Sequence, residues 1–137
     1  MLLVLWNFTA CFLGREYLTK DEIFKLVQEN EEWLLTCVQS GNAADAEFLD
    51  ERIKVNIENG YVDFDCGGRG LSVSGVDYGF YYSPEDQPLR YASYTGYGDQ
   101  LLPQGDGWYL GSESRNEGDR YYTEKICSCF YYYESSF

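Results

Sequence analysis

IKVNIENGYVDFDC, residues 53–66, decides the fold, because it predicts a β-hairpin. Asn59-Gly60 at its centre suits a type I′ turn, whose twist matches that of the flanking strands. A two-residue loop places three apolar pairs on one face: Ile57 with Val62, Val55 with Phe64, and Ile53 with Cys66. The other face pairs Asn56 with Asp63 and Lys54 with Asp65. Register and hydrophobic pattern agree, so we expect the apolar face to pack on the core.

The chain after Cys66 predicts further antiparallel strands. Its composition changes to glycine, tyrosine and short runs of β-forming residues, which prolines and glycines separate. The runs are Gly75–Tyr82, Leu89–Tyr94, Gly107–Ser112, Arg120–Thr123 and Ile126–Glu134. We expect these runs and the hairpin to form one strongly twisted antiparallel sheet.

A helix is predicted over residues 19–39. Thr19 and Glu22 have the spacing of a capping box, and Ser40-Gly41 ends the apolar pattern. One arc of the helix holds Ile23, Leu26, Val27, Trp33, Leu34, Cys37 and Val38, and the opposite arc holds Asp21, Glu22, Glu29 and Glu32. The helix therefore packs with one face and presents carboxylates on the other. A shorter acidic helix should follow, from Asn42 to Asp50.

These elements predict a single α+β domain over residues 1–137. The apolar start of the chain lacks the basic region and cleavage site of a signal peptide, and Arg15-Glu16 closes it too early for a membrane span. We expect an N-terminal strand there. The predicted architecture is this strand and one or two acidic helices, packed on the twisted sheet.

The net charge of −13, from 23 acidic and 10 basic residues, constrains the partners of the chain. Both halves are acidic, and 18% aromatic residues is too many for a disordered acidic chain, so the charge belongs to a folded body. Such a domain repels nucleic acid and anionic membrane and attracts basic surfaces. We expect a basic protein partner, with no direct nucleic-acid or membrane binding, and leave a homodimer open. Five cysteines without regular spacing indicate reduced thiols in a cytoplasm.

The chain carries no catalytic or cofactor signature. It has no histidine, which removes the commonest general base and metal ligand. Cys127-Ser128-Cys129 would place both thiols on one face of a strand, but the spacing is not the Cys-x-x-Cys pair of structural zinc. The glycine-rich stretch 67–70 follows two aspartates instead of opening a helix, so we interpret it as a strand end and turn. We predict a protein that is not an enzyme and holds no metal or cofactor.

Adjacent tyrosines are the most informative surface signal. Tyr81-Tyr82, Tyr121-Tyr122 and Tyr131-Tyr132-Tyr133 direct rings to both faces of successive strands. A small sheet has one face for a core, so we expect some of these rings to be exposed, as in protein interfaces. Exposed tyrosines and a carboxylate pair would also suit a carbohydrate-binding or hydrolase domain.

The leading hypothesis is an inhibitor that occupies the nucleic-acid-binding groove of a basic nuclease. Acids along a helix, with a rise of about 1.5 Å per residue, approximate the roughly 3.4 Å per phosphate of one DNA strand. Exposed tyrosines would stack on arginine in the place of bases. The partner-binding residues that we predict are Asp21, Glu22, Glu29, Glu32, Asp63, Asp65, Tyr81, Tyr82, Glu113, Glu117 and Asp119.

In size, charge and lack of catalytic motifs, the chain is similar to the small acidic proteins that phages and mobile elements use against CRISPR and restriction nucleases. The likeness is one of composition, and no motif is shared. An immunity protein that neutralises a basic toxin is the main alternative. A structural accessory protein of a capsid or tail is a further alternative.

Overall fold

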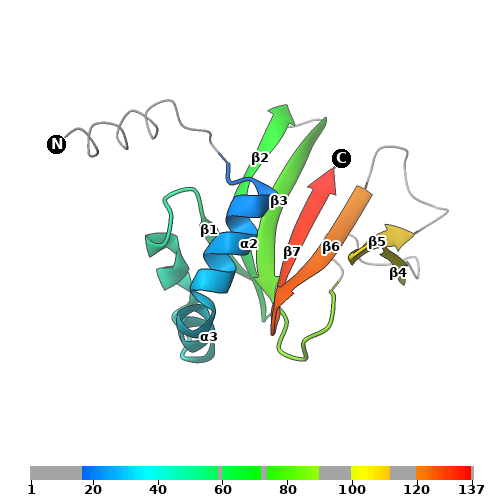
Figure 1. Cartoon of the computed structure of the whole chain (residues 1–137). Helices are drawn as coiled ribbons and strands as arrows, with labels where there is room; N and C mark the ends of the chain where they lie inside the picture. Colours follow the sequence, from blue (N-terminus) through cyan, green and yellow to red (C-terminus); the bar gives the residue numbers. More distant parts are fainter. Residues whose placement is uncertain (1–16, 59, 72–73, 90–99, 112–119, 137) are drawn as a thin grey trace.

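One antiparallel sheet organises the chain, which is α+β (Figure 1). The computed structural model describes residues 17–58, 60–71, 74–89, 100–111 and 120–136. In these ranges the strands are β1 Lys54–Glu58, β2 Tyr61–Leu71, β3 Ser74–Tyr82, β4 Gln100–Gln104, β5 Gly107–Gly111, β6 Arg120–Cys127 and β7 Phe130–Ser136. Their order across the sheet is β1-β2-β3-β7-β6-β5-β4. The predicted N-terminal strand lies outside the described residues.

The predicted hairpin is confirmed in its register. β1 and β2 pair Ile57 with Val62, Val55 with Phe64, Asn56 with Asp63, and Lys54 with Asp65. Ile53 precedes β1, so its predicted pair with Cys66 is not part of the ladder. The predicted turn at residues 67–70 is wrong, because β2 continues through the glycines to Leu71. A bulge between Asp65 and Gly68 takes up the irregularity, with Gly67 at a φ of 103° that favours glycine.

The C-terminal strands differ from the prediction in two places. β6 runs unbroken from Arg120 to Cys127, where a gap between Thr123 and Ile126 was expected. The expected strand Ile126–Glu134 is divided between β6 and β7, and Cys127 pairs with Phe130 across a two-residue turn. Cys129 lies in this turn at a φ of 70°, so the two thiols do not share one face of a strand. β4 was not predicted, because Pro103 argues against a central strand. It is an edge strand, where a missing N–H is tolerated.

The long predicted helix is two helices, α2 Lys20–Glu29 and α3 Glu31–Gln39. Asn30 separates them, with φ −122° and ψ 21°. Its side-chain amide donates to the Leu26 carbonyl oxygen at 2.8 Å. Asparagine competes in this way for helical backbone groups, which explains the break. The shorter acidic helix is the 3-10 helix η1, Ala43–Phe48.

The break corrects the predicted burial of Trp33. The buried helical side chains are Ile23 and Val27 on α2, and Leu34 and Cys37 on α3. Trp33 lies outside this line and is 41% exposed. A continuous helix of 3.6 residues per turn would have kept it on the buried arc. A large aromatic side chain is therefore left on the surface of an otherwise acidic segment.

The helical face of the sheet carries the main core. α2 contacts β3, β7 and β6. The rings of Phe64 and Phe80 stack with centroids 4.4 Å apart, and Phe130 meets both edge-on. Tyr132, also fully buried, contacts Phe24 of α2. Stacked and edge-to-face arrangements are the favourable ones for aromatic rings, so this cluster fixes how α2 lies on the sheet.

A second core lies on the opposite face of the same strands, against expectation. It contains Tyr81, Leu110, Tyr121, Tyr131 and Tyr133, each no more than 5% exposed. Two of their hydroxyls bind Leu89: the Leu89 amide donates to the Tyr81 hydroxyl at 2.9 Å, and Tyr121 donates to the Leu89 carbonyl at 2.8 Å. Leu89, Leu101 and Trp108 pack against the cluster. The prediction that paired tyrosines leave exposed rings is wrong for these four.

Truncation of Trp33 and of its neighbour Leu34 should destabilise the protein to different extents. Leu34→Ala should lower the free energy of unfolding by about 2–5 kcal/mol, because Leu34 is fully buried and a cavity would remain. Trp33→Ala should lower it by less than Leu34→Ala does, because the Trp33 side chain is 41% exposed and its removal leaves no closed cavity. Urea denaturation of both variants measures the difference. Equal losses would contradict the exposure of Trp33.

Candidate functional site

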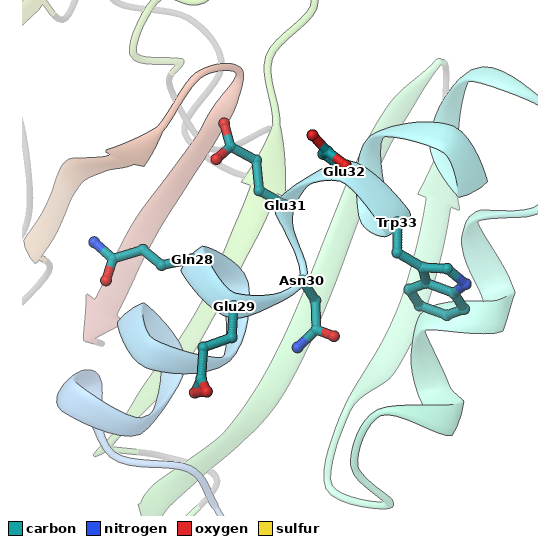
Figure 2. A pocket seen from close by; sticks show the side chains of 6 residues that line it. All are labelled: Gln28, Glu29, Asn30, Glu31, Glu32 and Trp33. Atoms are coloured by element: carbon teal, nitrogen blue, oxygen red, sulfur yellow. The ribbon is translucent and has the colours of Figure 1, made fainter.

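The break between α2 and α3 forms a groove, which we call the kink groove. Gln28, Glu29, Asn30, Glu31, Glu32 and Trp33 line it, and its volume is about 450 Å³ (Figure 2). Gln28 and Trp33 point to opposite sides of the break (Figure 2). The groove exists because Asn30 ends one helix and begins the next. A sequence that is acidic and helical thus becomes a concave acidic surface.

The side chains of the kink groove combine negative charge with one aromatic ring. Glu29 and Glu32 are exposed and Glu31 is half-buried. Trp33 is the only aromatic residue among the six that line the groove. Carboxylates accept hydrogen bonds from ammonium and guanidinium groups, and tryptophan offers the strongest face for a cation. The groove is therefore suited to basic side chains.

One wall of the groove adjoins the β6–β7 turn. The Gln28 side-chain amide donates to the Ile126 carbonyl oxygen at 3.5 Å. Burial raises the pKa of the Cys127 thiol to about 12, and the nearby Glu31 carboxylate, which accepts its hydrogen bond, contributes. The Glu31 carboxylate is thus already engaged by the Cys127 thiol. Glu29 and Glu32 remain available to a partner.

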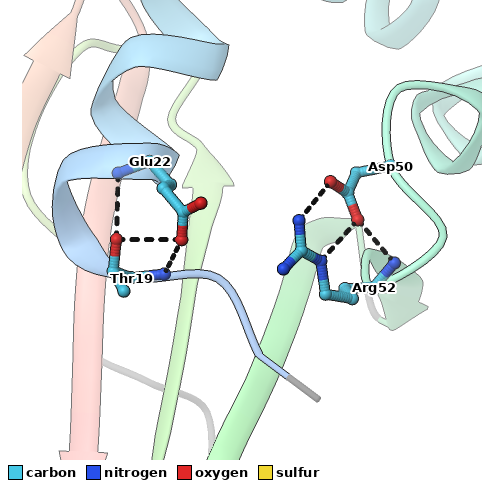
Figure 3. Close-up of polar contacts among 4 residues, drawn as sticks. All are labelled: Thr19, Glu22, Asp50 and Arg52. Carbon is cyan, nitrogen blue, oxygen red and sulfur yellow. Dashed lines mark hydrogen bonds and ion pairs between the residues drawn. The ribbon is translucent and has the colours of Figure 1, made fainter. Parts of the chain in front are cut away.

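Internal ion pairs neutralise basic residues near this surface. Lys20 binds Glu124 at 2.8 Å, and Lys125 binds Asp86 at 2.7 Å. Arg52 forms a bidentate pair with Asp50, both of its bonds being 2.9 Å long (Figure 3). Three of the five basic side chains that the structure describes are held in this way. The exposed carboxylates of the kink groove have no such partner among the described ion pairs.

Lys20 occupies an aromatic box as well as an ion pair. Its ammonium lies 5.4 Å from the ring centroids of Tyr122 and Tyr132 and 5.7 Å from that of Phe24. Burial raises the pKa of Glu124, but hydrogen bonds from Lys20 and Tyr122 outweigh it and hold the pKa below its ordinary value. Lys20 therefore points at the sheet, where it anchors the first turn of α2 and leaves the acidic side uncompensated.

The structure separates the predicted site residues into exposed, half-buried and buried groups, and some lie outside the described residues. Asp21, Glu29 and Glu32 are exposed, as predicted. Glu22 is half-buried, because its carboxylate accepts the Thr19 amide at 3.0 Å in the capping box (Figure 3). Asp65 and Tyr82 are half-buried, and Asp65 accepts the Gly67 amide at 2.9 Å. The predicted residues outside the described ranges are Glu113, Glu117 and Asp119.

Two predicted contact residues are buried, which corrects their placement on the surface. Asp63 is 4% exposed and Tyr81 is 0% exposed. Both lie on the face of β2 and β3 that carries the second core, and they pair with each other across the strands. The polar face of the hairpin is therefore an interior surface at this point. Neither side chain can meet a partner without unfolding.

Trp33 is the functional candidate that the sequence pattern missed. Its helical phase placed it with the buried residues, at the end of their arc nearest the acids, and it is 41% exposed. Asn30 inside a helical pattern was the available signal, since asparagine favours helix ends over helix interiors.

Comparisons with known proteins add no assignment: no family model, curated protein or solved structure matches the chain. Among the residues that the structure describes, no group of three or more cysteine, aspartate and glutamate side chains could hold a metal ion. Over the same residues, no helix has both the length and the apolar character to cross a lipid bilayer.

Replacing Lys20 tests the anchoring of α2. Lys20→Met keeps an aliphatic chain and removes the charge, so it should lower the free energy of unfolding by about 1–2 kcal/mol through lost cation–π and ion-pair contacts. The stability that comes from the Lys20–Glu124 ion pair should be fully present above the ordinary carboxyl pKa. It should be lost as the pH falls through the lowered pKa of Glu124 in the folded protein. Urea denaturation at neutral and acidic pH measures both. Lys25→Met, at an exposed position, is the matched control.

The Cys127 thiol should resist alkylation in the folded protein. With a pKa of about 12, only about one thiol in ten thousand is ionised at pH 8, and the thiolate is the reactive form. Mass spectrometry after iodoacetamide treatment should find Cys127 unmodified in native protein and modified in urea. Rapid modification of Cys127 in the native protein would contradict its burial beside Glu31.

Proposed function

We propose that this chain is a small acidic inhibitor that binds a basic protein and occupies its nucleic-acid-binding groove. The observation that carries the proposal is the kink groove, where exposed Glu29 and Glu32 lie beside the exposed ring of Trp33. Basic grooves that hold nucleic acid contain arginine and lysine directed at phosphates and bases. The same side chains would meet carboxylates and an indole here.

The arrangement favours a local cluster over a continuous track of charge. The break at Asn30 interrupts the row of acids expected on one long helix, and Glu29, Glu31 and Glu32 all line the groove at the break. A cluster of this size imitates a few phosphates. Trp33, in place of the buried tyrosines, supplies the ring on which a guanidinium group can stack.

The partner class in this proposal is a nuclease that acts in the cytoplasm, with a phage or mobile element as the source of the inhibitor. Charge complementarity speeds the encounter and suppresses acidic competitors. An immunity protein for a basic toxin would use the same surface against another partner. Carbohydrate binding is less well supported, because Tyr81, Tyr121, Tyr131 and Tyr133 are buried.

Charge reversal in the kink groove tests the proposal. Glu29→Lys with Glu32→Lys should reduce capture of basic proteins from a host lysate, and capture by the wild type should fall between about 50 mM and 500 mM salt as ions screen the surface. Stability should change by no more than about 0.5 kcal/mol, because both side chains are exposed. Quantitative mass spectrometry of the captured proteins, followed by a nuclease assay, provides the readout.

Asp106→Lys is the control for a single Glu32→Lys. It makes the same change in net charge at an exposed position between β4 and β5. Binding that depends on the kink groove should fall for Glu32→Lys and persist for Asp106→Lys. Equal effects would indicate that only total charge matters, and unchanged capture by the double reversal would exclude the groove.

A further inference from the structure

Three large apolar side chains are exposed at the β1 end of the sheet. Phe48 is 86% exposed, Ile57 60% and Trp33 41%. They lie on η1, β1 and α3, in that order. Leu102 and Tyr109, on β4 and β5, are the other large apolar residues exposed in the described ranges, and they lie at the opposite end of the sheet.

The three elements that carry these side chains are packed on one another. η1 contacts both α3 and β1, and β1 is the edge strand beside β2 (Figure 1). The Asn42 amide donates to the Cys37 carbonyl at 2.8 Å, which fixes the turn from α3 into η1. The Val55 amide donates to Glu47 Oε2 at 2.9 Å, which ties η1 to β1. We call this α3–η1–β1 face the edge surface.

The edge surface is more apolar than its position requires. Burial of a phenylalanine side chain stabilises a folded protein in proportion to the apolar area removed from water. Phe48 is 86% exposed, so it contributes almost none of this stabilisation. Single exposed apolar residues are common, but three on contiguous elements mark a contact area. An occupant that covers Phe48 and Ile57 would recover the buried area.

The rim of the edge surface is acidic. Residues 28–58 contain eight acidic and two basic side chains. Asp45, Glu47, Glu51 and Glu58 are exposed. Of the two basic residues, Arg52 is held by Asp50, and Lys54 is exposed. An occupant must therefore bring positive charge together with apolar groups.

A second copy of the chain does not meet this requirement. Each copy carries a net charge of −13, so two acidic rims would repel. Pairing of two β1 edges would also have to displace Glu47, which already binds the Val55 amide on the outer side of the strand. Charge and hydrogen bonding both favour a foreign, basic occupant.

We propose that the edge surface docks an amphipathic basic segment of the partner, whose apolar side chains cover Phe48 and Ile57 while its lysines and arginines meet the acidic rim. This inference rests on the proposed function, because it extends the same basic partner from the kink groove across Trp33 to the β1 edge. The groove would supply charge recognition and the edge surface the apolar contact, a division typical of protein interfaces.

Two synthetic peptides test this docking with the full chain. They have equal length and equal lysine content, and one carries leucine on a helical face where the other carries serine. The leucine peptide should bind more tightly by fluorescence anisotropy. Phe48→Ser should weaken its binding by about tenfold or more, and Leu102→Ser, at the other end of the sheet, should leave it unchanged. Ile57→Ser, a second exposed position, should act like Phe48→Ser.

The outcomes separate this inference from the proposed function. If both peptides bind equally and neither Phe48→Ser nor Ile57→Ser matters, the edge surface is not the docking site, while charge recognition stands. If neither peptide binds at low salt, the acidic surface does not attract basic chains and the proposed function fails with it. If the wild type sediments as a dimer that Phe48→Ser dissociates, a second copy is the occupant and the proposal is wrong. Circular dichroism confirms that each variant is folded.

Discussion

The central strand β7 is the constraint on which the rest of the structure depends. Its alternating side chains are apolar on both faces: Phe130 and Tyr132 enter the core under α2, and Tyr131 and Tyr133 enter the second core. Because successive residues of a strand face opposite sides, this one segment obliges both faces of the sheet to be covered. Among the described tyrosines, Tyr81, Tyr121, Tyr131, Tyr132 and Tyr133 are therefore interior.

Buried hydroxyls make the second core specific as well as apolar. The Tyr81 hydroxyl oxygen lies 2.7 Å from the Thr123 hydroxyl oxygen, and the Thr123 hydroxyl donates to the Tyr132 carbonyl oxygen at 2.7 Å. Tyr131 donates to the Asp86 carbonyl at 2.9 Å, and this residue also binds Lys125. Burial of a hydroxyl without a partner is costly, so these bonds select one packing of the rings. Through Asp86, the same network holds the ammonium group of Lys125 in an ion pair.

The candidate site arises from a defect in a regular element. The break at Asn30 ends α2 and begins α3, and Glu29, Glu32 and the exposed ring of Trp33 line the groove that it leaves. Meanwhile Lys20 and Arg52 are bound internally. Each of these bases pairs with one acid, so the excess of acids, and with it the net charge of −13, is unchanged.

The sequence alone determined the elements whose signals are local. The Asn59-Gly60 turn with its alternating pattern specified the register of β1 and β2, and Thr19 with Glu22 specified the start of α2, because each depends on residues within a few positions. It also determined the acidity of the body. Only the tertiary structure decided that Asp63 and Tyr81 are interior, since burial on the second face of the sheet depends on Leu89 and Trp108, which are distant in sequence. It likewise decided that Trp33 is exposed, because the choice between a straight and a broken helix depends on packing against the sheet as well as on Asn30.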